Sequence, residues 1–181
     1  HGFPDITITV GHLGHLIVAV IGHGEHLGAK IHYLWEDEPR GTIGALSRLA
    51  WEDETGPLLV MNGDLLTDFN YRDFLEEHVK SRAAISVGVY YKPIAINLGV
   101  LDVNSENRVT GFREKPVLSF PCSMGIYILE PDVLPLIPAE GSYGFDQLMA
   151  MCLERNIPVR AHPFDGLWLD IGRVEDYQSA T

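Results

Sequence analysis

The sequence has few of the features that mark membrane-bound, secreted or nucleic-acid-binding proteins. Two cysteines in 181 residues cannot build a disulfide scaffold. The longest uninterrupted apolar run, residues 16–21, is far too short to cross a bilayer. Thirteen Lys and Arg face 25 Asp and Glu, so the net charge of −12 disfavours nucleic acid or an anionic membrane as a partner. Since no stretch resembles a secretory signal, a cytoplasmic protein is expected.

Two common nucleotide-binding signatures are missing as well. Neither a GxGxxG fingerprint nor a Walker A loop occurs, which argues against nicotinamide dinucleotide enzymes and P-loop NTPases. What the chain does have is a composition of 46% hydrophobic and 21% charged residues, typical of a globular protein with a full core. Because no repeat, linker or low-complexity tract divides it, a single domain over residues 1–181 is expected.

The apolar pattern predicts an α/β fold. Strands expected at residues 6–10, 30–34 and 58–61 alternate with a helix at 13–21 and a second helix from Thr42. Such alternation is typical of a doubly wound, mostly parallel sheet flanked by helices. A polar turn at 104–107 predicts a hairpin of strands 98–103 and 108–112, which would make the sheet mixed. The other expected elements are helices at 71–81 and 174–180, strands at 84–90, 123–129, 159–162 and 167–171, and a short helix after Pro131. The helix from Thr42 is expected to have a buried stripe of Ile43, Leu46, Leu49 and Ala50. A further helical stripe, also expected in the core, consists of Phe145, Leu148, Met149, Cys152 and Leu153.

The strand at residues 58–61 leads into a motif suited to a hard cation. Its four apolar residues predict a strand that is buried on both faces. Ligands of open α/β sheets bind beyond the carboxyl ends of the strands, which is where Asn62-Gly63-Asp64 is expected. The Asp64 carboxylate follows a glycine that lets a ligand approach the backbone, and it suits Mg²⁺. The alternative is a simple turn with a solvated aspartate.

A second aspartate near the end of the chain could share that cation. Asp170 lies among Trp, Leu, Ile and Gly residues, and burying a carboxylate without a partner is costly. Pairing Asp170 with Asp64 at one Mg²⁺ would remove that cost and provide a clamp for phosphoryl chemistry. The alternative is that Asp170 caps the helix expected at 174–180.

Two further segments carry groups that could bind polar parts of a ligand. Residues 38–46 form a glycine-containing loop before a helix, and this arrangement is expected to present free backbone N–H groups. Residues 113–116 end a strand, and proline there fixes the exit of the chain. Lys115 could then hold a phosphate and Glu114 sugar hydroxyls, the alternative being a solvated run of charges. Four histidines near the start of the chain could form a metal site, the alternative being solvated side chains of a loop. They are His12, His15, His23 and His26.

Six segments, taken in order, resemble the sugar-1-phosphate nucleotidyltransferases, and especially their mannose-1-phosphate guanylyltransferase-like members. They are residues 38–46, 62–64, 97–100, 113–116, 123–127 and 168–172. The resemblance implies a nucleotidyltransferase or Rossmann-like fold. It also implies Mg²⁺-dependent transfer of a nucleotidyl group from an NTP to a sugar-1-phosphate, releasing pyrophosphate and forming an NDP-sugar.

The resemblance also implies a role for individual residues. The catalytic residues would be Asp64, Lys115 and Asp170, with the two aspartates binding Mg²⁺ and Lys115 neutralising the sugar phosphate. The sugar side would be formed by Gly99, Glu114, Ser123, Gly125 and Trp168. The nucleotide would contact Glu38, Pro39, Gly41, Thr42, Gly44, Asn62 and Gly63.

The family's opening strand, its Gly-rich loop with a catalytic arginine, and its Pro-Lys pair have no counterpart in this sequence. The fold is therefore expected to be N-terminally truncated, with impaired activity and an exposed sheet edge that would favour a homo-oligomer. The sugar side departs from the family at Asn97, Ser123 and Leu167. The resemblance favours guanylyl or thymidylyl transfer, with GTP and mannose-1-phosphate or a heptose phosphate, in polysaccharide biosynthesis.

Two alternatives from other functional classes stay open. The first is a catalytically inactive relative that binds a nucleotide or sugar nucleotide as a regulatory subunit. The second is a nucleotide-sugar-dependent glycosyltransferase, a class that shares the α/β plan and a metal. Such an enzyme expects two aspartates in one short motif at a strand end, whereas Asn62-Gly63-Asp64 supplies one.

Overall fold

The computed structural model describes residues 1–49 and 56–172, and these fall into two compact units. The first unit comprises His1–Asn62, Asn70–Ser86 and Tyr127–Arg160. The second comprises Gly63–Phe69, Val87–Ile126 and Ala161–Thr181. The helix expected at 174–180 lies outside the described residues, as does Ala50. The single domain expected from the sequence stays a prediction.

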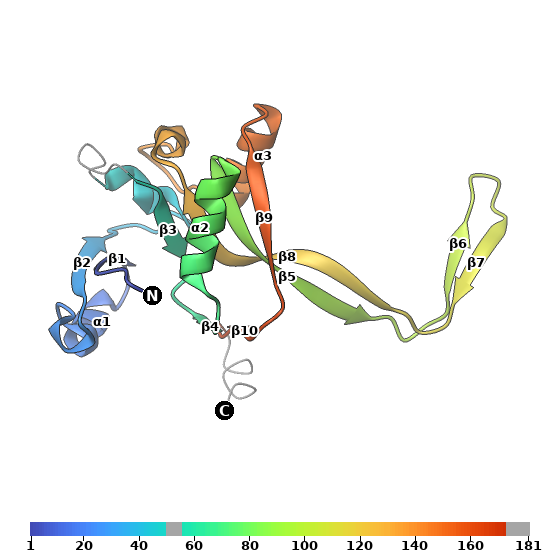
Figure 1. Ribbon diagram of the computed structural model, residues 1–181, viewed down its shortest axis with the longest axis horizontal. Helices are drawn as coiled ribbons and strands as arrows, with labels where there is room; N and C mark the ends of the chain where they lie inside the picture. Colours follow the sequence, from blue (N-terminus) through green and yellow to red (C-terminus); the bar gives the residue numbers. More distant parts are fainter. Residues whose placement is uncertain (50–55, 173–181) are drawn as a thin grey trace. The chain divides into compact units, whose positions relative to one another are not determined.

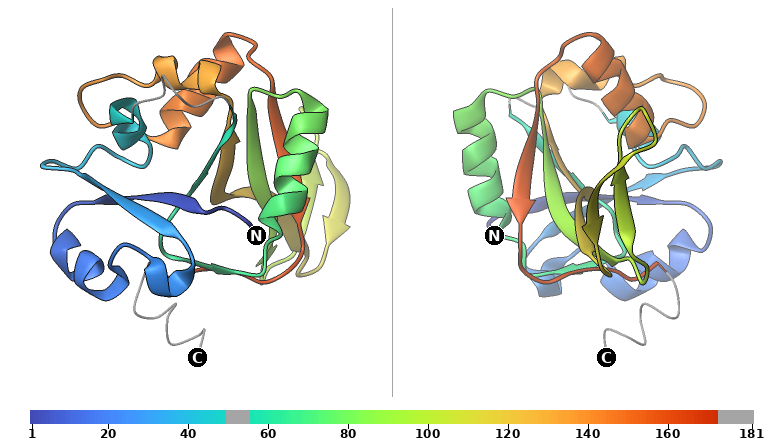
Figure 2. Two further views of the ribbon diagram at one scale, coloured as in Figure 1. Left: turned by 60° about the vertical axis from the view of Figure 1, so that its left-hand side comes forward. Right: turned by 90° about the vertical axis from the view of Figure 1, so that its right-hand side faces the viewer.

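A parallel strand pair opens the first unit. β1 (Asp5–Val10) and β2 (Lys30–Trp35) lie side by side, with Asp5 opposite Lys30 and Val10 opposite Trp35 (Figure 2). Parallel strands need a crossover connection, which α1 (Gly14–Ile21) and the 3₁₀ helix η1 (Glu25–Leu27) supply. The sequence-based expectation of a strand, a helix and a strand in this region is confirmed. Both strands therefore end at the same edge of the pair.

Four strands form a larger sheet in the order β3, β8, β5 and β9 (Figure 1). Their bounds are Leu58–Met61, Val117–Leu129, Ile85–Ala95 and Val159–Phe164, respectively. The prediction that β3 is buried on both faces is wrong, because its residues are half-buried and Met61 is 42% exposed. The reason is that β3 is an edge strand of this sheet, whereas the apolar run is typical of an inner one.

Two α-helices, α2 and α3, contribute buried side chains to the core of the first unit. In α2 (Tyr71–Ser81), Asn70 accepts hydrogen bonds from the amides of residues 72 and 73, and Phe74 and His78, one turn apart, are buried. His78 Nδ1 lies 2.8 Å from Ser86 Oγ, and its Nε2 lies 3.0 Å from Glu130 Oε1. The imidazole thereby joins α2 to β5 and to the residue that directly follows β8.

In α3 (Phe145–Glu154), the buried residues are Phe145, Leu148 and Cys152. The Phe145 ring stacks on Tyr127 with centroids 3.6 Å apart. The prediction that Leu153 is also buried is wrong, since 63% of it is exposed. Consecutive helical residues point about 100° apart, so Leu153 turns away from the face that holds Cys152.

Two expected helices are short 3₁₀ segments. The helix expected from Thr42 is η2 (Gly44–Arg48), which buries Ala45 and Leu46, and the one after Pro131 is η3 (Pro131–Leu136). Tight 3₁₀ turns are common as connectors and suit such short pieces. In the part of the chain that the structure describes, no helix is long and apolar enough to cross a lipid bilayer.

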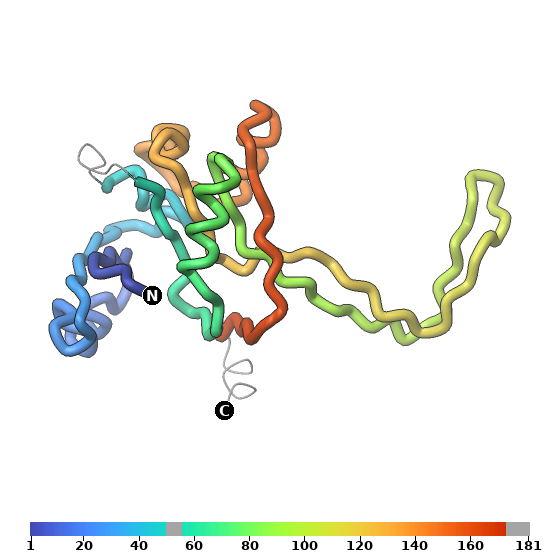
Figure 3. Tube along the Cα trace, viewed as in Figure 1, coloured from blue at the N-terminus to red at the C-terminus, as the bar shows by residue number. Residues whose placement is uncertain are grey.

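The second unit contains two antiparallel ribbons. β4 (Leu65–Thr67) pairs with β10 (Trp168–Asp170), and Figure 3 traces these distant segments of the chain side by side. β6 (Val100–Val103) and β7 (Val109–Arg113) form the hairpin expected from the sequence, joined to the ends of β5 and β8 (Figure 1). Parallel and antiparallel pairs with flanking helices make this the mixed α/β fold that the pattern predicted.

Candidate functional site

The β4–β10 ribbon brings two distant aspartates together. A Cβ atom at Gly172 would lie 3.2 Å from Asp64 Oδ2 and 3.3 Å from Asp170 Oδ1. Ile171 N–H donates to the carbonyl of Asp64 at 2.9 Å, and Gly172 N–H donates to Asp170 Oδ1 at 3.2 Å. The two carboxylates therefore converge beside a residue that has no side chain.

The Asp170 carboxylate is exposed, as is that of Asp64. The prediction that Asp170 is buried and therefore needs a partner is wrong. β10 is only three residues long and belongs to a two-stranded ribbon, which cannot enclose the residue at its end. Whether Asp170 caps a following helix concerns residues outside the described part of the chain.

The two aspartates fit a magnesium ion. Mg²⁺ is usually held by one or two carboxylates, with water and substrate phosphates as the other ligands. Any side chain on Gly172 would fill the space that the two carboxylates share. Among the described residues, no three His, Cys, Asp or Glu side chains form a metal-binding group, so the histidines near α1 form none either.

Trp168 fixes this ribbon to the longer strands of the second unit. Its indole N–H donates to the carbonyl of Met124 at 3.0 Å. Its ring lies against Tyr90, with centroids 5.4 Å apart and planes tilted by 34°. The predicted contact of Trp168 with a sugar stays a prediction, but its indole N–H already has a protein partner.

The residues expected on the sugar side also lie in the second unit. A Cβ atom at Gly99 would lie 2.6 Å from the Phe112 ring and 3.3 Å from Glu114 Oε2, so this glycine permits a close approach of both. Lys115 has a φ of 43°, in the left-handed region. In the described part of the chain, neither Glu114 nor Lys115 is hydrogen-bonded or ion-paired to Asp64 or Asp170.

Ser123 and Gly125 are joined locally, since the Gly125 amide donates to Ser123 Oγ at 3.3 Å. Gly125 has a φ of 73°, a conformation that favours glycine. On the nucleotide side, Asn62 is half-buried after β3, and a Cβ atom at Gly63 would meet nothing within 4 Å. Packing therefore does not require a glycine at position 63.

The expectation that the loop at residues 38–46 presents free amides is wrong for Ile43 and Gly44. Ile43 and Gly44 both donate to the carbonyl of Tyr143, at 3.3 and 3.1 Å. Thr42 Oγ1 accepts from the amide of Phe145 at 3.0 Å, at the start of α3. Gly41 has a φ of 78°, and a Cβ there would lie 2.6 Å from the Tyr143 carbonyl oxygen. The loop packs against the 139–145 segment, which takes up the amides of Ile43 and Gly44 and the hydroxyl of Thr42.

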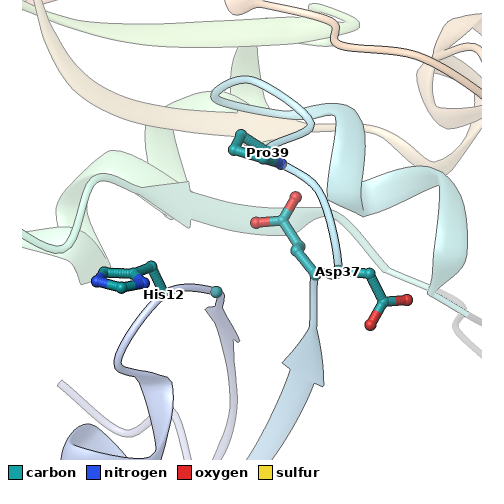
Figure 4. Close-up of a pocket in the computed structure, with 5 residues that line it drawn as sticks. His12, Asp37 and Pro39 are labelled. Atoms are coloured by element: carbon teal, nitrogen blue, oxygen red, sulfur yellow. The ribbon is translucent and has the colours of Figure 1, made fainter.

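A cleft of about 390 Å³ lies in the first unit, beside Pro39 (Figure 4). Gly11 and His12 follow β1, and Glu36 and Asp37 follow β2, so the cleft borders the carboxyl ends of two parallel strands. That is where open α/β sheets bind ligands, and the volume is within the range of small-molecule sites. Of the lining residues, Pro39 was assigned to the nucleotide and His12 was weighed as a metal ligand, whereas Gly11, Glu36 and Asp37 were given no role. Their position after the predicted strands is the signal that could have identified them.

Comparison with known proteins identifies the family of this chain and several of its relatives. The profile of the nucleotidyl transferase family matches residues 1–181. A UTP--glucose-1-phosphate uridylyltransferase of Synechocystis sp. is 28% identical over 99% of this chain and 51% of its own length. A mannose-1-phosphate guanyltransferase of Schizosaccharomyces pombe is 31% identical, again over 99% and 51%. The chain thus spans about half the length of the curated relatives it matches.

Solved structures show the same fold. The crystal structure of HddC from Yersinia pseudotuberculosis superposes with a TM-score of 0.73 at 22% identity, covering 99% of this chain and 78% of that one. HddC complexed with GMP-PN gives a TM-score of 0.70 at 20% identity, with the same coverage. The predicted fold class and the resemblance to the sugar-1-phosphate nucleotidyltransferases are both confirmed. Because the family profile spans every residue, this chain belongs to the nucleotidyl transferase family.

Proposed function

We propose that this protein is an Mg²⁺-dependent sugar-1-phosphate nucleotidyltransferase, which joins an NTP to a sugar-1-phosphate, releases pyrophosphate and forms an NDP-sugar. The observation that carries the proposal is the convergence of Asp64 and Asp170 beside Gly172 in a member of the nucleotidyl transferase family. Relatives named as uridylyl- and guanyltransferases of sugar 1-phosphates support this reaction class.

Asp64 and Asp170 would hold the cation between the two phosphorylated reactants. When bound, a divalent cation supplies charge neutralisation to the phosphate oxygens. Both carboxylates are exposed, so coordination positions stay open for phosphate oxygens and water. The chain itself contributes positioning, because phosphoryl-type transfer between bound reactants needs no protein nucleophile.

Lys115 and Glu114 would hold the sugar-1-phosphate. The Lys115 ammonium supplies a positive charge for the phosphate, and the Glu114 carboxylate accepts hydrogen bonds from hydroxyl groups. Glu114 Oε2 approaches the backbone of Gly99, so these two residues border one space. Roles for Ser123, Gly125 and Trp168 on the sugar side rest on the family resemblance.

The cleft beside Pro39 would receive the nucleobase, and guanine is the base we favour. Glu36 and Asp37 line the cleft. Glu36 Oε1 accepts from the Arg40 amide at 3.2 Å, and the remaining lone pairs of this carboxylate could accept from the N–H donors on the edge of guanine. The ring of Pro39 offers apolar surface to the base. A relative named mannose-1-phosphate guanyltransferase and a neighbour complexed with GMP-PN support GTP, and the former supports mannose-1-phosphate.

Pyrophosphate release across a panel of NTPs and sugar 1-phosphates tests the proposal. The highest kcat/KM is expected with GTP and mannose-1-phosphate in the presence of Mg²⁺. Asp64→Asn and Asp170→Asn should each lower kcat by roughly 100-fold or more, because each removes a charged metal ligand. The matched control is Asp165→Asn, which neutralises an exposed carboxylate of the same unit. Full turnover in either site variant would refute the metal assignment.

Two further assays, of NDP-sugar binding and of sugar transfer, separate the two alternatives from the proposed reaction. Saturable binding of an NDP-sugar without pyrophosphate from any substrate pair would identify a regulatory relative. Transfer of a sugar from an NDP-sugar to an acceptor would identify a glycosyltransferase. Membership of the nucleotidyl transferase family favours the proposed reaction over both.

A further inference from the structure

The geometry points to Thr67 and Asp68 as positioning residues that fix the register of β4 against β10 and thereby bring Asp64 and Asp170 together. This inference rests on the proposed function, since it concerns the two aspartates assigned to the cation. Neither residue was singled out from the sequence. Both act on a single partner, Leu167, which directly precedes β10.

Leu167 is held at both of its backbone polar groups. Thr67 Oγ1 donates to the Leu167 carbonyl at 2.7 Å, and Asp68 Oδ1 accepts from the Leu167 amide at 2.7 Å. The Asp68 amide adds a longer bond to the same carbonyl at 3.3 Å. Thr67 Oγ1 also accepts from the amide of Phe69 at 3.1 Å, which fixes the hydroxyl. We call Thr67 and Asp68 the Leu167 clamp.

The ribbon itself is too short to set its register securely. Only three residue pairs form it: Trp168 with Thr67, Leu169 with Leu66, and Asp170 with Leu65. Short two-stranded ribbons are marginally stable, and a slip of one residue turns every side chain to the opposite face. Asp170 would then point away from Asp64. The clamp closes one end of the ribbon, and the bond from Ile171 N–H to the Asp64 carbonyl closes the other.

The clamp is tied to a buried aromatic group. Phe69, the next residue, is 1% exposed, and its ring packs edge-on against Phe164 and His162 with centroids 5.0 and 5.5 Å apart. Gly166 lets the clamp close, because a Cβ there would lie 2.6 Å from Asp68 Oδ1 and 2.5 Å from the Phe164 ring. The buried Phe69 therefore anchors the clamp, and through the clamp it fixes the positions of the exposed Asp64 and Asp170.

The test compares a clamp-free variant with two matched variants of the 181-residue chain. Thr67→Val with Asp68→Ala removes both side-chain bonds to Leu167. Asp68→Asn keeps an acceptor oxygen and loses only the charge. The control is Thr110→Val, because Thr110 Oγ1 makes the same kind of cross-strand bond, to the Asp102 carbonyl at 3.1 Å, in the β6–β7 ribbon.

Two readouts are measured on each variant. Amide hydrogen exchange at Ile171 reports the register, and broadening of the Gly172 amide signal by added Mn²⁺ reports the cation at the aspartates. The clamp-free variant should lose roughly tenfold in Ile171 protection and roughly tenfold in apparent Mn²⁺ affinity. Asp68→Asn and Thr110→Val should match the parent in both. Retained protection of the buried β8 amides at Ile126 and Ile128 establishes that the sheet is still folded.

The outcomes separate this inference from the proposed function. Unchanged protection and Mn²⁺ affinity in the clamp-free variant overturn the clamp while leaving the metal assignment intact. Absence of Mn²⁺ broadening in the parent chain overturns the metal assignment, and Ile171 protection then still decides whether the clamp sets the register. Equal losses in Asp68→Asn and the clamp-free variant would assign the effect to charge, which also overturns the clamp.

Discussion

Replacing Gly172 with alanine is the most direct perturbation of the two-aspartate site. The added methyl carbon would lie 3.2 Å from Asp64 Oδ2 and 3.3 Å from Asp170 Oδ1. Mg²⁺ binds carboxylate oxygens at about 2.0–2.1 Å, so both oxygens must close around the ion in space that the methyl group takes. The φ of Gly172 is not in the left-handed region, so alanine adds no backbone strain.

The expected loss is roughly 10- to 100-fold in affinity for Mn²⁺ or Mg²⁺, the range for changes that displace metal ligands without removing them. Electron paramagnetic resonance of free Mn²⁺ measures the affinity directly, and competition by Mg²⁺ gives the affinity for that ion. Thermal unfolding should stay within about 2 °C of the parent, since Gly172 is exposed and unstrained. The control is Gly56→Ala, another glycine without left-handed φ, where a Cβ would meet nothing within 4 Å.

One result would refute this reasoning. If Gly172→Ala binds Mn²⁺ as tightly as the parent chain while Asp64→Asn does not, the cation lies on the far side of the carboxylates from Gly172. The shared space beside this glycine would then have no part in binding. A tighter site in the alanine variant would refute it equally.

Three further predictions concern stability and reactivity. His78→Leu should lower the free energy of unfolding by about 1–3 kcal/mol in urea titration, because it leaves a buried serine hydroxyl without its imidazole partner. Gly41→Ala should cost about 2–4 kcal/mol, since it combines a φ of 78° with a methyl group 2.6 Å from a carbonyl oxygen. Burial raises the pKa of the Cys152 thiol despite the nearby Arg155, so iodoacetamide at pH 8 should alkylate half-buried Cys122 first.

Each of these predictions has a matched comparison. His26→Leu changes an exposed histidine and should leave unfolding within about 0.5 kcal/mol of the parent. Gly28→Ala adds a methyl group at a φ of 68° with nothing within 4 Å, so it isolates the cost of backbone strain, about 1–2 kcal/mol. Equal costs at positions 28 and 41 would contradict the clash with the carbonyl. Equal alkylation of both thiols in the folded chain would contradict the burial argument.

The sequence by itself determined those helices, strands and turns that depend only on residues close together in the chain. The strand at β1, the helix at α2 and the β6–β7 hairpin with its polar turn were all predicted from the sequence and are present. The reason is that period, capping and turn chemistry act between residues within a few positions of each other. The same patterns did not distinguish an α-helix from the 3₁₀ segment η2, where amides of the loop bond to Tyr143.

Only the tertiary structure determined which side chains are exposed and which groups, distant in the sequence, lie close together. The apolar run of β3 reads as an inner strand, yet strand order places it at an edge, and Asp170 is exposed although its neighbours are apolar. Strand pairing also creates the cleft after β1 and β2 and sets Asp64 beside Asp170, more than one hundred residues apart. The sequence determined which groups are available, through its carboxylates at strand ends. Which of them meet depends on strand order and register, because those involve contacts between segments that share no local pattern.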